Sequence, residues 1–147
     1  MYNTPRMVQD QELFEENIMD MKPGDIVDRW TILRMKLRAQ RDNNSILGLC
    51  VAHGTASEQI LAIGDPNLLD LVEINAKIWT LESMGFKVRT TMPGIELHGS
   101  ALQLAASIAM EITALNKLRM AAIERINLEG ELNAKDETCQ DGKDQVV

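Results

Sequence analysis

Residues 100–130, SALQLAASIAMEITALNKLRMAAIERINLEG, carry the longest helical apolar pattern in the chain. Inner positions recur at alternating steps of three and four residues, which is typical of a seam between packed helices. The positions are Ala105, Ile108, Ile112, Leu115, Arg119, Ala122, Ile126 and Glu129. Only Arg119 and Glu129 break the apolar character of this seam. We therefore expect one long helix that begins at Gly99 or Ser100 and ends near Gly130.

A second helix is predicted to begin at Asp65-Pro66, where the aspartate is the N-cap and proline takes the first helical position. It is predicted to end at Gly85, since glycine readily adopts the left-handed conformation that ends many helices. Its inner positions are Leu68, Leu71, Val72, Asn75, Ile78, Trp79 and Glu82, and Leu69, Ile74 and Leu81 extend its apolar surface, so we expect it to be largely buried. At 1.5 Å per residue the two helices are roughly 30 and 45 Å long, and the last one overhangs its partner. Residues 118–128 then need a cover, either from the helix that contains Trp30 or from a second copy of the protein.

The first half of the chain gives less regular signals. A short helix is expected over residues 8–20, and a second from an N-cap at Asp25 to about Arg41. Residues 42–64 look irregular, with a short helix that starts at a capping box on Thr55 and ends at Gly64. Residues 86–98 suit a loop or a small ribbon.

Composition agrees with a helical domain. Of the 147 residues, 45% are apolar and 3% are aromatic, so aliphatic residues and methionine must fill the core. We expect an all-α fold, a helical bundle built on a long antiparallel helical hairpin, with an irregular linker before the last helix. Residues 1–131 form the single helical domain, and residues 132–147 form a disordered acidic tail.

Charge and cysteine content limit the classes of function that the chain could have. A net charge of −7 disfavours nucleic acid, and no apolar stretch approaches the ~20 residues of a membrane span. Residues 1–10 lack the pattern of a secretion signal, so we expect a cytoplasmic protein. Cys50 and Cys139 are expected to be free thiols.

Several polar residues lie inside the apolar stripes, namely Asn75, Trp79, Glu82, Asn116 and Arg119. A buried charge without a partner costs several kcal/mol, so we expect Asn75, Glu82 and Arg119 to form a polar network. The favoured interpretation is structural, a device that fixes helix register or dimer pairing. The alternative is a ligand pocket in which Arg119 holds an anionic group and Trp79 stacks on a ring.

Three segments carry a resemblance to known proteins. They are Asp28-Arg29-Trp30-Thr31-Ile32-Leu33-x-x-Lys36, Asn75-x-x-Ile78-Trp79-x-x-Glu82 and Leu115-Asn116-x-x-Arg119-x-x-x-Ile123-Glu124-x-Ile126-Asn127. Together they resemble two uncharacterised families of small helical bacterial proteins, often encoded beside surface-polysaccharide glycosyltransferases. Those families have a histidine and an acidic pair after the tryptophan, where this chain has Thr80 and Glu82-Ser83. The resemblance implies a helical fold and shared core polar residues, and it implies no reaction.

Two weaker patterns suggest metal chemistry. Glu12-x-x-Glu15-Glu16 with Asp25-x-x-Asp28 faintly resembles the magnesium ligands of all-α nucleotide pyrophosphohydrolases, although helix capping and a solvated face explain these acids more simply. Cys50-x-x-His53 offers two zinc ligands where three or four are needed, with only His98 and Cys139 left to complete a site. We assign no metal, no cofactor and no catalytic residue.

A basic series on the helix of Trp30 comprises Arg29, Arg34, Lys36, Arg38 and Arg41, and suits either a solvated helix face or an acidic partner. The chain also lacks a phosphate loop and a nucleophile elbow. We therefore expect a non-enzymatic, homo-oligomeric helical protein that binds a protein partner or a small anionic, nucleotide-like ligand. The alternatives are a magnesium-dependent pyrophosphohydrolase and an accessory factor for surface-polysaccharide synthesis.

Overall fold

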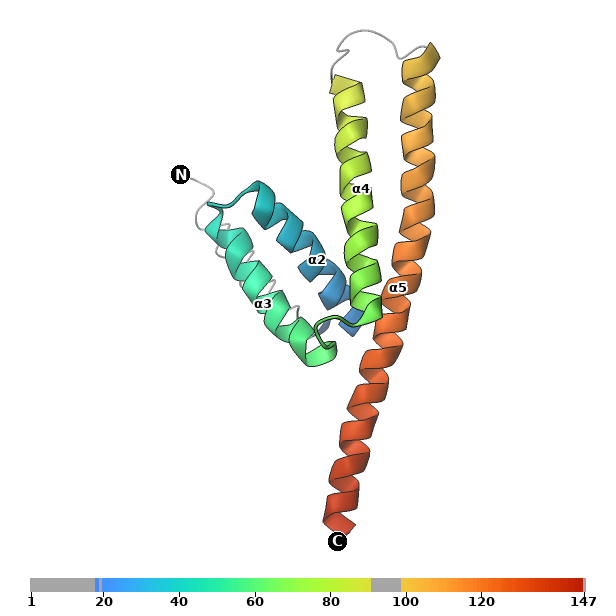
Figure 1. Cartoon of the computed structure of the whole chain (residues 1–147). Helices are drawn as coiled ribbons and strands as arrows, with labels where there is room; N and C mark the ends of the chain where they lie inside the picture. The colour runs from blue at the N-terminus through green and yellow to red at the C-terminus, as the bar shows by residue number, and fades with distance from the viewer. Residues whose placement is uncertain (1–17, 19, 91–98, 147) are drawn as a thin grey trace.

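The computed structural model describes residue 18, residues 20–90 and residues 99–146, with side chains as far as residue 132. Its elements are the helices α2 (Pro23–Ala39), α3 (Asn44–Ile60), α4 (Pro66–Thr90) and α5 (Gly99–Val146). Figure 1 shows two antiparallel pairs: α2 lies beside α3, and α4 lies beside α5. No strand occurs in the ranges given above, so the predicted all-α bundle on a long helical hairpin is confirmed.

The α4–α5 hairpin is held along the predicted seam. Every one of the eight seam positions from Ala105 to Glu129 is buried or half-buried. Near one end of the hairpin Asn67 on α4 donates a hydrogen bond to Glu129 on α5, and toward the other end Gly85 faces Ile108. Since residues early in α4 meet residues late in α5, the two helices run antiparallel.

The overhanging part of α5 is covered by α2 of the same chain. The Gly24 amide donates a hydrogen bond to Asn127 Oδ1 at 2.7 Å, so α5 satisfies one of the free N–H groups at the start of α2. A β-carbon added at Gly130 would lie 2.9 Å from the Pro23 ring, which shows how closely this proline of α2 approaches the backbone of α5. Beyond this contact α5 continues past the other helices (Figure 1).

The core lies where α2, the end of α3, α4 and α5 meet. Its buried apolar residues are Val27, Leu61, Leu68, Leu71, Ala122, Ile123 and Ile126. Leu71 and Ile126 are among the largest side chains without exposed surface. Half-buried Trp30 packs against this cluster, and its indole lies over Gly54 of α3, where a β-carbon would be 2.9 Å from Nε1.

Residues 44–60 form one continuous helix, which corrects the prediction of an irregular segment. Asn43 caps α3 by accepting a hydrogen bond from the Ile46 amide at 3.2 Å. Thr55 does not begin a helix; its hydroxyl donates to the Val51 carbonyl one turn earlier, and Gly64 lies in the following loop with φ of +90°. The small residues that look loop-like in sequence instead allow close packing, because Gly54 makes room for Trp30.

Three predicted helix ends are also wrong. Helix α2 begins at Pro23 with Lys22 as its N-cap, so Asp25 lies in the first turn, as expected when proline takes the first helical position. Helix α4 runs through Gly85 to Thr90, because this glycine packs against α5 rather than ending the helix. Helix α5 likewise runs through Gly130 to Val146.

Other predictions fall partly outside the structure. The helix predicted over 8–20 lies outside the described residues except for Ile18 and Asp20. Of the loop or ribbon predicted over 86–98, residues 86–90 belong to α4 instead, and residues 91–98 lie outside the described residues. Helix α4 is less buried than predicted, since Leu69 is 57% exposed. The boundary between a domain of residues 1–131 and a disordered tail of 132–147 stays a prediction. No helix in the part of the chain described is long and apolar enough to cross a membrane.

The close approach of α2 to α5 gives a test of the fold. A β-carbon at Gly24 would lie 2.3 Å from the Ile123 carbonyl oxygen, so we expect Gly24→Ala to lower the free energy of unfolding by about 1–3 kcal/mol. Gly85→Ala is the matched control. Its β-carbon would meet atoms no closer than 3.4 Å, and alanine favours a helix by up to ~1 kcal/mol. Urea unfolding measures both, and equal stability of the two variants would contradict this packing.

Candidate functional site

The polar residues of the bundle meet at Asp28, on the inner face of α2. Asp28 follows Val27, which packs in the core, and its side chain therefore enters the bundle with only 4% of its surface exposed. Thr31, one turn later on α2, is buried as well. An ionised carboxylate in such a place must be paired and hydrogen-bonded to be tolerated.

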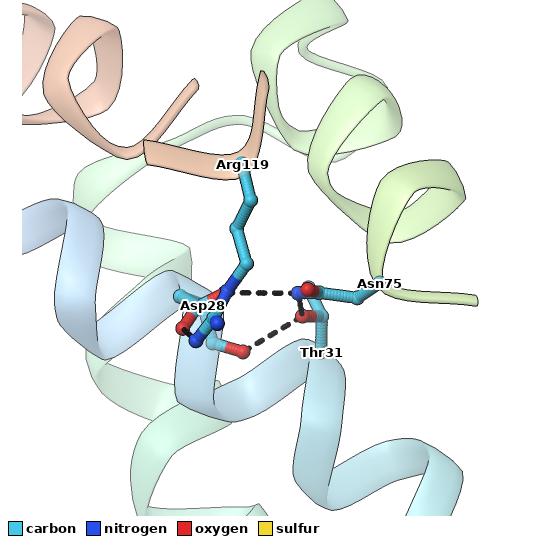
Figure 2. Close-up of polar contacts among 4 residues, drawn as sticks. All are labelled: Asp28, Thr31, Asn75 and Arg119. Atoms are coloured by element: carbon cyan, nitrogen blue, oxygen red, sulfur yellow. Dashed lines mark hydrogen bonds and ion pairs between the residues drawn. The ribbon is translucent and has the colours of Figure 1, made fainter. Parts of the chain in front are cut away.

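Figure 2 shows how α4 and α5 supply the partners of this carboxylate. Arg119 on α5 donates from Nε to Asp28 Oδ1 at 2.9 Å and from Nη2 to Oδ2 at 2.5 Å. Asn75 on α4 donates from Nδ2 to Asp28 Oδ1 at 2.9 Å and to the Thr31 hydroxyl at 2.7 Å. Thr31 donates in turn to the Asp28 backbone carbonyl at 2.7 Å. We call these four residues the Asp28 network.

The pairing of Arg119 with Asp28 is bidentate, the strongest form of a charge-assisted hydrogen bond. Hydrogen bonding to Asp28 raises the pKa of Arg119, and the charges of Asp28, Asp25 and Glu82 add to this, while burial acts in the opposite direction. The Arg119 side chain is 29% exposed and the Asp28 side chain only 6%. Solvent therefore reaches the pair from the arginine side.

The structure brings together two of the five predicted site residues. Asn75 and Arg119 meet at the Asp28 network, as the expected polar network requires. Glu82 does not join it; its side chain is exposed on α4 and acts on Arg119 only through its charge. Trp79 and Asn116 are half-buried outside the network.

Sequence reasoning assigned Asp28 to the start of a helix and missed its central place. The available signal was the segment from Asp28 to Thr31, in which an acid lies on the same stripe as apolar core positions. An aspartate so close to a helix start also interacts favourably with the helix dipole, and this explanation was preferred to a buried position for Asp28. Thr31 was missed because its role depends on Asn75 from another helix.

The geometry limits what Arg119 can do chemically. Its two donors to Asp28 are already used, so an external anion would have to compete with a carboxylate held at 2.5 and 2.9 Å. Both Asp28 oxygens accept hydrogen bonds as well, which leaves this acid poorly placed to hold magnesium with Asp25. Glu12, Glu15 and Glu16, the other acids of that pattern, lie outside the described residues.

Cys50 and His53 are both buried on α3. Burial raises the pKa of the Cys50 thiol, with the charge of Arg34 opposing it. Burial lowers the pKa of His53 and the Arg29 charge adds to this, whereas the hydrogen bond from Nδ1 to the Leu49 carbonyl at 2.8 Å acts against it. No group of three metal-binding side chains comes together among the side chains that the structure describes, which include neither His98 nor Cys139.

Comparison with protein-family models, with curated proteins and with solved structures finds no match for this chain. The resemblance to families encoded beside glycosyltransferases therefore stays a prediction.

The Asp28 network can be tested by removing its members singly and together. We expect Arg119→Met to lower the free energy of unfolding by about 3–5 kcal/mol, because it leaves a buried carboxylate unpaired. Adding Asp28→Leu should restore at least half of the loss, since the unpaired charge is then gone. Urea unfolding of the single and double variants measures this recovery.

Arg125→Met is the control for loss of an arginine from α5. Arg125 pairs with Asp70 at 3.8 Å on the surface, where such pairs contribute less than about 1 kcal/mol. If Arg119→Met were as stable as this control and lost a bound small anion, a ligand role for Arg119 would replace the structural one.

Proposed function

We propose that this protein is a non-enzymatic interaction protein, and that its binding surface is the outer side of the α4–α5 hairpin beyond the Asp28 network. The observation that carries the proposal is that few residues in this part of the hairpin are buried. Over residues 76–90 and 99–118, where the structure describes them, only Ile78, Gly85 and Ile108 are buried. Figure 1 shows this end of the hairpin extending beyond the contact with α2. A two-helix layer of this kind needs a partner to complete a core.

The composition of α5 supports the same surface. Residues 99–118 contain only two charged side chains, Glu111 and Lys117, although the whole chain is 25% charged. Large apolar residues are exposed there: Leu102, Leu104, Met110 and Leu118. Exposed apolar side chains with few charges mark the centre of protein interfaces rather than a solvated face.

The shape of the surface suits a helix. A hollow of about 690 Å³ runs between α4 and α5, with Ala76, Leu81, Ala114 and Leu115 among its lining residues. Two further hollows, of about 630 and 470 Å³, lie along α5 and share Met110 and Ala114. Small residues at such positions allow another helix to approach closely.

A charge at the centre of this surface should abolish binding and spare the fold. We expect Met110→Glu to change the free energy of unfolding by less than about 0.5 kcal/mol, since Met110 is 74% exposed. Complexes that the wild-type protein forms, with itself or with another protein, should be lost. Native mass spectrometry of the purified proteins measures the complexes, and urea unfolding measures the stability.

Val51→Glu is the matched control, because Val51 is an exposed apolar residue on α3, away from this surface. It should leave the complexes unchanged. A wild-type protein that forms no complex with itself or with another protein, or a Met110→Glu variant that assembles normally, would overturn the proposed function.

A second candidate function is binding of a small anionic ligand, at a place other than Arg119. A hollow of about 380 Å³ is lined by Trp30, Arg34, Leu37, Arg38, Arg41 and Cys50. Arg34 lies 5.2 Å from the centre of the Trp30 ring. No carboxylate of the described residues pairs with the three arginines. The opposite explanation is that Arg38 complements the negative end of α2, but three positive charges exceed the half charge of a helix terminus.

Tripolyphosphate tests this hollow. We expect calorimetry to detect salt-sensitive binding that weakens roughly tenfold or more in Arg38→Gln/Arg41→Gln, because charge-assisted hydrogen bonds are lost. The double variant Arg89→Gln/Arg125→Gln changes the net charge equally at exposed sites outside the hollow, and it should bind as the wild type does. Equal weakening in both variants, or no binding by the wild type, would rule this candidate out.

A further inference from the structure

We infer that the partner of the α4–α5 surface is a second copy of this chain, whose α5 crosses the first in antiparallel direction at Ala114. This inference rests on the proposed function and names the occupant of the same surface. Ala114 contributes to all three hollows along the hairpin, so it lies at their common centre. Its small side chain lets two helices approach there without a large residue between them.

The side chains on either side of Ala114 match this arrangement. A two-fold axis through Ala114 places each residue opposite the one equally far along the helix in the second copy. Glu111 and Lys117 lie three residues before and after Ala114, so each acid meets a base of the other chain. These are the two charged residues of the 99–118 segment, and a parallel or shifted pairing would not match them twice.

The apolar residues fit the same register. Met110 and Leu118 lie four residues before and after Ala114 and line the same hollow with it. They are 74% and 56% exposed in the single chain. In the antiparallel pair Met110 of each copy packs on Leu118 of the other, so the contact occurs twice. A second copy of the chain carries the matching spacing of charged and apolar residues by symmetry, whereas an unrelated partner would have it only by chance.

Self-association also suits the charge of the surface. The whole chain carries a net charge of −7, which makes two copies repel each other. On the segment 99–118 the two charges have opposite signs and cancel. The copies therefore meet where repulsion is least, and the acidic parts of the chain stay apart.

A charge exchange tests the register. Glu111→Lys alone and Lys117→Glu alone each place like charges opposite one another, and symmetry doubles the effect, so we expect the dimer dissociation constant to rise roughly tenfold. The double variant Glu111→Lys/Lys117→Glu restores opposite charges and should return to within about threefold of the wild type. Analytical ultracentrifugation measures the dissociation constants.

Cross-linking provides a second measurement. In a Cys139→Ser background, Ala114→Cys should form a disulfide-linked dimer on mild oxidation, because the two positions face each other across the axis. Leu102→Cys should not, since its two copies would lie about 36 Å apart.

The outcomes separate this inference from the proposed function. A mixed complex with another protein that Met110→Glu abolishes would leave the proposed function intact and overturn the second copy as partner. A homodimer in which the double charge exchange fails to restore affinity would overturn the register. A wild-type protein that forms no complex at all would overturn both.

Discussion

A buried carboxylate is the constraint on which the arrangement of α2, α4 and α5 depends. Asp28 is removed from water, and its charge is tolerated because Arg119 and Asn75 reach it from two other helices. Hydrogen bonds require specific distances, whereas apolar contacts tolerate sliding along a helix. The Asp28 network therefore defines how far α2 is shifted along the α4–α5 hairpin, and the apolar core then fills the space beside it.

The position of this network divides the hairpin into two unequal parts. On one side α2 docks on α5 through Pro23 and Gly24, and the buried cluster around Leu71 and Ile126 supplies most of the core. On the other side α4 and α5 contact mainly each other. Most of the buried core of the single chain thus lies in one part, and the proposed interaction surface lies on the other.

Four arginines of the chain differ in whether a carboxylate of the described residues neutralises them. Arg119 is neutralised by Asp28, so its charge serves the fold. Arg34, Arg38 and Arg41 line a hollow whose charged residues are all basic. An anionic ligand would gain most from this hollow, because no internal carboxylate among the described residues competes there.

The sequence by itself determined the helical class, the antiparallel hairpin and the inner face of α5, because apolar periodicity is a local property that burial must respect. It also indicated that Asn75 and Arg119 share a polar environment. Tertiary structure alone decided where helices end and which acid pairs with Arg119. Gly85 and Gly130 resemble helix stops in sequence, yet both lie inside helices: Gly85 packs against Ile108 of α5, and Gly130 makes room for Pro23 of α2. Gly24 receives its cap from Asn127, far along the chain. Such features depend on residues distant in sequence, so no local pattern contains them.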